Sequence, residues 1–389
     1  MQYNFDEIID RHGTDAIKIE VIEKEWKRTD LLPLWVADMD FRTPACVLNA
    51  IRERLDNGVM GYTCAPDSYF QSIVDWCYRR YGWSIPSESI TYVPGIVPGV
   101  GMAIECFTNP GDKVMIQPPV YHPFRILSEK KGRQVVNNPL CYENGRYEMD
   151  FERMEKDIQG CKLFILCNPH NPGGRVWTRE ELLRVADICH RHKVLIFSDE
   201  IHCDLTFKPY HHTPFASISE EARMNSVTFM SPSKAFNMAG LVSSHALIFN
   251  PELRECFKNY LDAGELNMGH VFSYLSVRAA YTQGESWLEA VLDYIKENIL
   301  YIDSFLRNNL PVIKAVIPQA SYLVFLDCCE LHLSQPELNR FFIEKARLAL
   351  NDGEIFGKEG IGFMRLNAAS PRSVIEEAMN RLLQAYKQL

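Results

Sequence analysis

The feature that most constrains the fold is an alternation, through the middle of the chain, of short apolar runs with segments of helical periodicity. Between two such runs, residues 180–189 carry apolar side chains at helical spacing. Strands that are apolar throughout and separated by helices indicate a mostly parallel sheet covered on both faces. Six runs are expected to be strands: Ser89–Val93, Lys113–Ile116, Lys162–Leu166, Val194–Phe197, Val227–Met230 and Ala246–Phe249.

The last hundred residues or so have a different pattern. Apolar residues at helical spacing run from Leu288 to Leu306, until Asn308–Pro311 breaks the helix. A strand at 322–326 and helices at 336–350 and 371–387 are expected to follow. The pattern predicts a large domain and a smaller α+β domain, with an N-terminal segment that packs against the small domain. The predicted divisions are 1–47, 48–285 and 286–389.

Composition excludes several classes of function. The chain has 389 residues, 47% of them hydrophobic, and a net charge of −9, which suits a globular protein and argues against bulk binding to nucleic acid. Residues 1–7 lack the basic and apolar stretches of a signal peptide, and no apolar run is long enough to span a bilayer. Twelve cysteines without a CxxC pair disfavour zinc and disulfides, so free thiols in the cytoplasm are expected.

Lys234 follows the expected strand Val227–Met230, within the segment Ser231–Asn237. The end of such a strand is where open α/β sheets bind ligands. A lysine that is partly buried there loses its proton more easily and becomes a nucleophile toward a carbonyl group. Most lysines are surface charges, so the functional interpretation of Lys234 depends on the motifs that accompany it.

The segment Ser198–Asp204 places two aspartates, a glutamate and a histidine directly after the expected strand Val194–Phe197. A metal site is disfavoured because no companion motif such as HExxH is present. Two interpretations stay open. The carboxylates cap the following turn, or one of them holds a proton on a ring nitrogen of a ligand.

Two turns and one arginine complete the set of candidate features. Asn168–Gly174 is a rigid turn that is either purely structural or directs the Asn171 amide toward a ligand. Pro94–Gly101 joins a strand to a helix and exposes backbone amides that suit a phosphate, although such turns are more often structural. Arg365 lies in an apolar strand, where it bridges an internal carboxylate or binds the carboxylate of a ligand.

Together these features form a coherent set. A lysine can form an imine, and a carboxylate can pair with a pyridinium nitrogen. The hydroxyls of Ser231 and Ser233, with a helix N-terminus, can hold a phosphate, and an arginine can hold a carboxylate. Pyridoxal 5'-phosphate requires these groups when it acts on an amino acid.

Four motifs carry a resemblance to a known family: NPHNPGGRV, SDEIHCDL, SPSKAFNMAGL and GFMRLN, in that order. Over nearly the full length, the chain resembles the fold-type I pyridoxal-phosphate enzymes of aminotransferase class I and II. Leu32–Phe41, Gly61–Tyr62 and Leu350–Asn367 resemble the MalY/PatB branch of cystathionine β-lyases. The resemblance implies an aspartate aminotransferase-like α/β fold, a mostly parallel seven-stranded sheet and a homodimer with shared active sites.

The resemblance also implies roles by position. Lys234 would be the Schiff-base lysine, Asp199 the partner of the pyridine nitrogen and Arg365 the clamp on the substrate carboxylate. At the cofactor ring, the resemblance implies a contact of Asn171 with the phenolic oxygen, Tyr121 stacked on the ring and active in catalysis, and His202 beside the cofactor. At the phosphate, it implies the amides of Ile96 and Val97, the hydroxyls of Ser231 and Ser233, and Tyr62 of the neighbouring subunit. Ala37, Asn171 and Tyr62 are implied to lie near the substrate.

Two positions depart from many aminotransferases of this fold. Those enzymes have a tyrosine three residues after the aspartate and an arginine eight residues after the lysine, where this chain has His202 and Val242. His202 is usual for the branch. The missing arginine leaves the phosphate contacts less defined.

The expected reaction is β-elimination from cystathionine or a cysteine S-conjugate, which yields a thiol such as homocysteine, pyruvate and ammonia. The alternative is an amino-acid aminotransferase, because the same carbanion at Cα can be reprotonated on the cofactor. A third alternative, from another class, is regulation of transcription through a protein partner, as in some relatives. The expected partners are a small amino-acid substrate and a second copy of the chain, without nucleic acid, membrane or metal.

Overall fold

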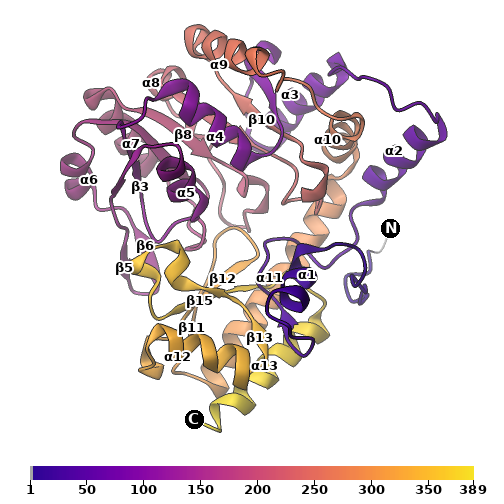
Figure 1. Ribbon diagram of the computed structural model, residues 1–389, viewed down its shortest axis with the longest axis vertical. Coiled ribbons are helices and arrows are strands. Elements are labelled where there is room, and N and C mark those ends of the chain that lie inside the picture. The colour runs from indigo at the N-terminus through magenta and orange to yellow at the C-terminus, as the bar shows by residue number, and fades with distance from the viewer. Residues whose placement is uncertain (1–2) are drawn as a thin grey trace.

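The computed structural model describes residues 3–389, so the first two residues of the predicted N-terminal segment lie outside the described range. Its largest element is a seven-stranded sheet flanked by helices (Figure 1). Five neighbouring strands are parallel, and β10 is antiparallel to both of its neighbours. The strand order is β2 (Ile90–Val93), β10 (Ser244–Leu247), β9 (Ser226–Met230), β8 (Leu195–Asp199), β7 (Cys161–Cys167), β3 (Lys113–Ile116) and β4 (Gln134–Asn137).

Alternate residues of β7 face two different cores. Phe164 packs in a cluster with helix α7 (Arg179–His192), and Leu163 packs in a cluster with helix α4 (Ile96–Phe107). Successive side chains of a strand point to opposite faces, so a strand covered on both faces must be apolar throughout. This explains why the predicted apolar runs became strands of this sheet. The predicted α/β fold with a mostly parallel sheet is confirmed.

Local signals in the sequence set several helix ends. Helix α7 begins at a capping box between Thr178 and Glu181. Helix α3 (Asp67–Tyr81) ends at Gly82, whose φ of 63° is a left-handed conformation that favours glycine. The other helices that precede residue 285 are α1 (Ile17–Lys24), α2 (Ala45–Asp56), α5 (Pro123–Lys130), α6 (Phe151–Asp157), α8 (Glu220–Met224), α9 (Pro251–Ala263) and α10 (Val271–Gln283).

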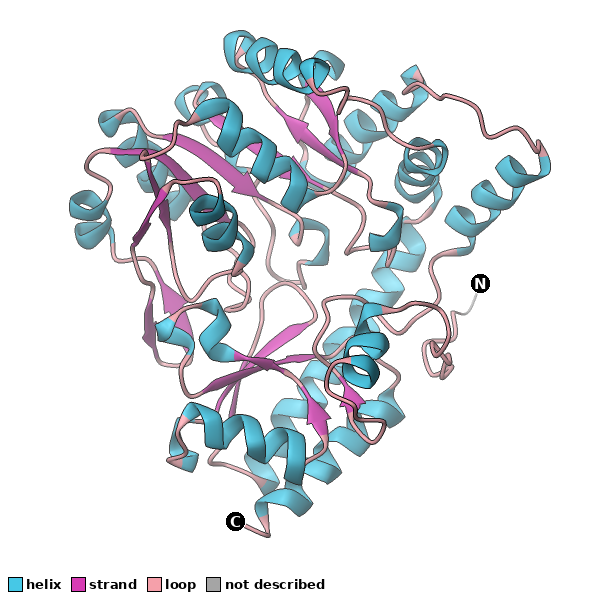
Figure 2. Ribbon diagram, viewed as in Figure 1, coloured by secondary structure: helices cyan, strands magenta, loops and turns pink. Residues whose placement is uncertain are grey.

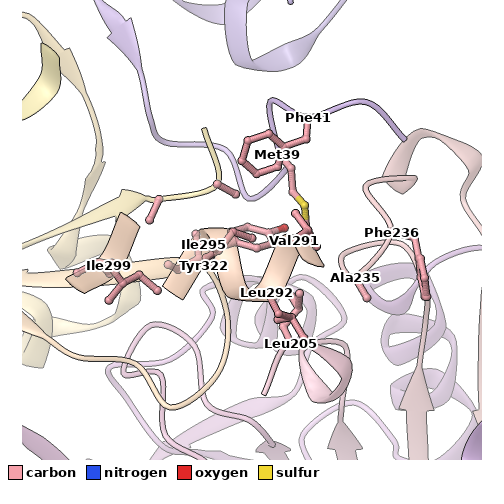
Figure 3. Packing of buried hydrophobic residues seen from close by; sticks show 14 of the residues in the cluster. Met39, Phe41, Leu205, Ala235, Phe236, Val291, Leu292, Ile295, Ile299 and Tyr322 are labelled. Carbon is pink, nitrogen blue, oxygen red and sulfur yellow. The ribbon is translucent and has the colours of Figure 1, made fainter. Parts of the chain in front are cut away.

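The C-terminal part is built on the long helix α11 (Glu285–Asn309) and an antiparallel four-stranded sheet (Figure 2). The predicted apolar stripe of α11 is buried along its whole length, from Leu288 to Leu306. Val291 and Ile295 lie in one cluster with side chains of the N-terminal segment, such as Met39 (Figure 3). The strand order is β11 (Lys314–Val316), β12 (Leu323–Asp327), β15 (Phe363–Asn367) and β14 (Asn351–Asp352).

The helix predicted over 336–350 is wrong in its second half. Helix α12 spans Gln335–Arg340, a π-helical turn follows at Phe341–Lys345, and Arg347 takes a left-handed φ of 53° that ends the helical path. Leu348–Ala349 then forms strand β13, parallel to β1 (Leu32–Pro33). Periodicity cannot separate a short apolar run in a strand from the end of a buried helix, and pairing with a distant segment decides the outcome.

The remaining elements are a small hairpin and the last helix, β5 (Cys141–Glu143), β6 (Arg146–Glu148) and α13 (Arg372–Tyr386). Across residues 3–389, no helix combines the length and apolarity that crossing a membrane requires. The division of the chain at residues 47 and 285 stays a prediction.

Candidate active site

A cavity of about 220 Å³ lies beside the carboxyl ends of β7, β8 and β9. This edge of a parallel sheet is where α/β proteins bind ligands, because the loops that follow the strands meet there. Segments far apart in the sequence contribute to its wall. The predicted residues that line it are Ala37, Ile96, Val97, Tyr121, Asn171, Asp199, His202, Ser233 and Lys234.

Three predicted residues do not line this cavity. The Ser231 hydroxyl is buried, 2.8 Å from the carbonyl oxygen of Ser243 and 2.9 Å from Ser233 Oγ, so it supports the turn. Arg365 is linked to the wall through a hydrogen bond to Asn171. Tyr62 is fully exposed, in a segment without regular secondary structure.

Lys234 lies in the turn that follows β9. Its Nζ donates a hydrogen bond to the Ala37 carbonyl oxygen at 2.6 Å, and the Tyr322 hydroxyl donates to the same oxygen at 2.9 Å. Burial lowers the pKa of Lys234 to about 8, although the nearby charge of Asp38 opposes this effect. An amine with such a pKa can act as a nucleophile or a base near neutral pH.

Asp199 is the last residue of β8, and its carboxyl group is buried in the cavity wall. Its Oδ1 accepts a hydrogen bond from the Ile201 amide at 3.1 Å. Burial raises the pKa of Asp199 to about 7, while the Ile201 amide opposes the rise. Burial makes the charge of the Asp199 carboxylate costly, so this carboxylate favours a cationic partner, such as a protonated ring nitrogen.

The two neighbouring acids of the same motif have structural partners. Glu200 accepts hydrogen bonds from the Ser198 hydroxyl and the Phe215 amide, both at 2.8 Å, and its other oxygen lies 2.7 Å from His212 Nε2. Asp204 accepts from Trp76 and Tyr81. Of the three acids, only Asp199 accepts a hydrogen bond from the turn that directly follows the strand, at the Ile201 amide, and its role at a ring nitrogen stays a prediction. No group of three or more potential metal ligands occurs among the described residues of the chain.

Asn171 and Arg365 form a connected pair. Arg365 Nη1 donates to Asn171 Oδ1 at 3.1 Å, and Nη2 donates to Asn351 Oδ1 and to the Trp35 carbonyl. Arg365 Nε is buried without a partner among residues 3–389, and its guanidinium lies 4.8 Å from the centre of the Phe356 ring. Burial lowers the pKa of Arg365 to about 10. Among residues 3–389, Arg365 forms no salt bridge to an Asp or Glu, so the internal carboxylate bridge predicted as one alternative is not formed.

One end of the cavity is rich in hydrogen-bond donors. Gly95 has a φ of 111° and precedes α4 without a side-chain cap, so the amides of Ile96 and Val97 in the first turn lack helical acceptors. Ser233 lies on the same cavity wall. A helix N-terminus with adjacent hydroxyls suits a phosphate group. Val242, which stands at the position of the missing arginine, lines the cavity with a left-handed φ of 38°.

Tyr121 and His202 supply ring systems to the wall. Burial raises the pKa of Tyr121, and the Asp199 charge adds to this rise. Burial also lowers the pKa of His202 to about 3, with help from the positive charges of Lys234 and Arg365. The imidazole is therefore neutral at physiological pH, and its Nδ1 has no partner among residues 3–389.

Tyr322 and the pair Ser243–Ser244 also belong to the site, although the sequence motifs do not point to them. Tyr322 begins the strand expected at 322–326, and nothing in the sequence distinguishes it from a core residue. Ser243 and Ser244 line the cavity just before and at the start of β10. Two consecutive hydroxyl residues, separated only by His245 from the apolar run Ala246–Phe249, are a usable signal.

Comparisons with known proteins agree with this geometry. The family model described as aminotransferase class I and II matches residues 29–382. Cystathionine beta-lyase PatB of Bacillus subtilis is 42% identical over 381 residues, covering 97% of this chain and 98% of PatB. Protein MalY of Escherichia coli is 33% identical and covers 99% of both chains.

A solved structure extends the likeness to three dimensions. Cystalysin from Treponema denticola, whose structure contains a pyridoxal 5'-phosphate cofactor, is 35% identical with a TM-score of 0.97 and covers 100% of both chains. The chain therefore belongs to the aminotransferase class I and II family, in the branch of MalY and PatB.

Proposed function

We propose that the protein is a pyridoxal 5'-phosphate-dependent carbon–sulfur β-lyase that acts on cystathionine or a cysteine S-conjugate. The observation that carries the proposal is the presence of Lys234 and Asp199 in one cavity, in a chain 42% identical to PatB along nearly its whole length. The products of such a reaction are a thiol, pyruvate and ammonia.

The groups around the cavity fit this cofactor. The Lys234 amine, whose pKa is depressed, suits the aldehyde carbon, and the buried Asp199 carboxylate suits the pyridine nitrogen. The amides of Ile96 and Val97 suit the phosphate. Asn171 Oδ1 is occupied by an arginine, so its Nδ2 is the donor that suits the phenolic oxygen.

When bound, the cofactor withdraws electrons from the α-carbon of an amino acid. Asp199 would hold the proton at the pyridine nitrogen, because a carboxylate beside that nitrogen favours its charged form. Lys234 would take the proton from Cα once its amine is free. With a pKa of about 8, roughly a tenth of the Lys234 amines are neutral at pH 7.

The substrate would be oriented by groups on the small-sheet side. Arg365 would bind the α-carboxylate, since its buried Nε lacks a protein partner and its charge lacks a carboxylate. The Ala37 carbonyl, which accepts from Lys234, would accept from the substrate amine. Tyr121 would cover the cofactor ring from the cavity wall and limit access of water to it.

We further propose a homodimer with shared active sites. Tyr62 is fully exposed and lies beside other exposed apolar side chains, Met60 and Met268, in one shallow depression. Exposed apolar residues gathered in this way are typical of protein interfaces. A tyrosine that does not reach its own cavity would reach that of the neighbouring subunit.

A cytoplasmic location is part of the proposal. All twelve cysteines are free thiols, and six of them are buried. Proteins with many unpaired cysteines suit a reducing compartment.

The decisive experiment measures two reactions on the purified protein loaded with pyridoxal 5'-phosphate. Cystathionine should give pyruvate and homocysteine in equal amounts, and it should perturb the visible absorbance of the bound cofactor. Transfer of the amino group to an added 2-oxo acid should be much slower than pyruvate release. If transfer is instead the faster reaction, the protein is an aminotransferase and the proposal is wrong.

A further inference from the structure

A pair of thiols lies outside the candidate active site. The Sγ atoms of Cys106 and Cys256 are 3.5 Å apart, although 150 residues separate them in the sequence. Cys106 is near the C-terminal end of α4, and Cys256 is in the first half of α9. Cys256 is exposed and Cys106 is half-buried, so a small reagent can reach the Cys256 sulfur. Among residues 3–389, no other two cysteine sulfurs lie within hydrogen-bonding distance.

Contacts next to both sulfurs hold the two helices in register. Glu105 on α4 accepts a hydrogen bond from the Tyr260 hydroxyl on α9 at 2.7 Å. Phe107 on α4 packs against Phe257 on α9, with ring centres 6.0 Å apart. Lys131 pairs with Glu105 at 2.9 Å and anchors the same part of α4 from a third segment. Neither helix can slide along the other without breaking these contacts, so the thiols stay adjacent.

We propose that Cys106 and Cys256 form a redox-modification site, which an organic disulfide such as glutathione disulfide converts into a covalent link between α4 and α9. The Cys256 thiolate attacks the disulfide and forms a mixed disulfide, releasing one thiolate. Cys106 then attacks the Cys256 sulfur and displaces the second thiolate. The protein loses two electrons and two protons, and the reagent is reduced to two thiols.

The geometry supports both the bond and the order of attack. A disulfide has a sulfur–sulfur distance of about 2.05 Å, so side-chain rotation must bring the atoms roughly 1.5 Å closer. Burial raises the pKa of Cys106 to about 12, with the neighbouring Cys256 as the second cause. The exposed Cys256 is therefore the first nucleophile, and Cys106 is the resolving thiol.

The position of the link predicts its effect. It lies at the end of α4 opposite to Ile96 and Val97, so it leaves the cavity lining unchanged. It closes a loop of 150 residues, and a link across a long loop restricts the unfolded chain. The modification therefore stabilises the fold and does not alter the chemistry of the cavity.

The test uses the full-length protein with its cofactor and glutathione disulfide as the probe. Peptide mapping by mass spectrometry under non-reducing conditions should detect a Cys106–Cys256 cross-link in the wild-type protein. The Tm should rise by roughly 5 °C, and dithiothreitol should reverse the rise. Cys106→Ala and Cys256→Ala should show neither change, whereas Cys141→Ala, at an exposed cysteine on β5, should respond like the wild type.

Two results would overturn the inference. One is glutathione that remains attached to Cys256 in the wild-type protein with no link to Cys106. The other is a link that forms without raising the Tm. Both measurements are made on the wild-type protein, so they hold even if a variant fails to fold, and neither depends on the reaction that the cavity catalyses.

Discussion

Arg365 Nη1 donates a hydrogen bond to Asn171 Oδ1 at 3.1 Å, across 194 residues of sequence. The bond joins β15 of the small sheet to the turn that follows β7 of the large sheet. It determines which end of the Asn171 amide faces the arginine, so Nδ2 remains the donor for a ligand. A single contact therefore links the residue proposed to hold the substrate to a residue proposed to hold the cofactor.

Lys234→Ala should abolish both attachment of the cofactor and turnover. We expect turnover of cystathionine to fall at least about 10³-fold, because the variant loses the nucleophile and the base together. The visible absorbance of the lysine-bound cofactor should also disappear. Lys258→Ala, at an exposed position of α9, is the matched control and should keep both properties. Turnover that survives in Lys234→Ala would rule out the proposed role.

Asp199→Asn should change how the stability of the cofactor-free protein depends on pH. Burial raises the pKa of Asp199 to about 7 from an ordinary value of 3.8, so the folded state binds this proton more tightly than the unfolded state. The stabilisation is complete below the unfolded pKa and is lost as the pH rises through 7.

Asparagine mimics the protonated acid at every pH. The Tm of Asp199→Asn, measured by calorimetry, should therefore equal that of the wild-type apoprotein near pH 4 and exceed it at pH 8. Parallel Tm curves for the two proteins would contradict the raised pKa. The same variant, loaded with cofactor, should lose roughly 10²-fold or more in turnover, because a neutral amide does not stabilise the charged ring.

Arg365→Lys should mainly weaken substrate binding. A lysine keeps the charge but loses the planar fork that binds a carboxylate through two hydrogen bonds. We expect the KM for cystathionine to rise roughly 10- to 100-fold while the cofactor absorbance stays unchanged. Arg340→Lys, at an exposed position of α12, should leave the KM unchanged. An unaltered KM in Arg365→Lys would exclude this arginine as the carboxylate clamp.

Lys18→Met should destabilise the segment that carries the Ala37 carbonyl. The Lys18 side chain is fully buried, and Nζ donates to both carboxylate oxygens of Asp40, at 2.9 and 2.8 Å. The substitution removes the fully buried member of the pair and leaves Asp40 with Arg11, at 3.0 Å, as its remaining ion-pair partner, so we expect a loss of about 2 kcal/mol in urea unfolding. Lys24→Met, which breaks a pair whose lysine is exposed, should lose much less stability. Equal losses in the two variants would contradict the role of burial.

Mixing two inactive variants tests whether Tyr62 serves the neighbouring subunit. Lys234→Ala and Tyr62→Ala subunits should recombine into heterodimers in which one of the two sites has every residue intact. After random exchange of equal amounts, half of the dimers are heterodimers, so activity should recover to roughly a quarter of the wild-type level. No recovery, with exchange shown by mass spectrometry, would place Tyr62 in its own subunit or outside the site.

Local patterns predicted the elements whose environment is uniform along their length. Strand β7 was predictable because both of its faces are covered, and α11 was predictable because one face is buried from Leu288 to Leu306. The end of α12 was not predictable, because the run Leu348–Ala349 suits a helix and a strand equally. Its pairing with Leu32, more than 300 positions earlier in the chain, decides between them.

The sequence by itself determined the alternating architecture and placed Lys234, Asn171 and an Asp–Glu pair at the ends of strands. Only the tertiary structure decided that Asp199 faces the cavity while Glu200 is held by Ser198, His212 and the amide of Phe215. It also decided which two of twelve thiols are neighbours. The physical reason is that periodicity reports how a segment meets the core, whereas the partner of a buried polar group depends on segments brought together from distant parts of the chain.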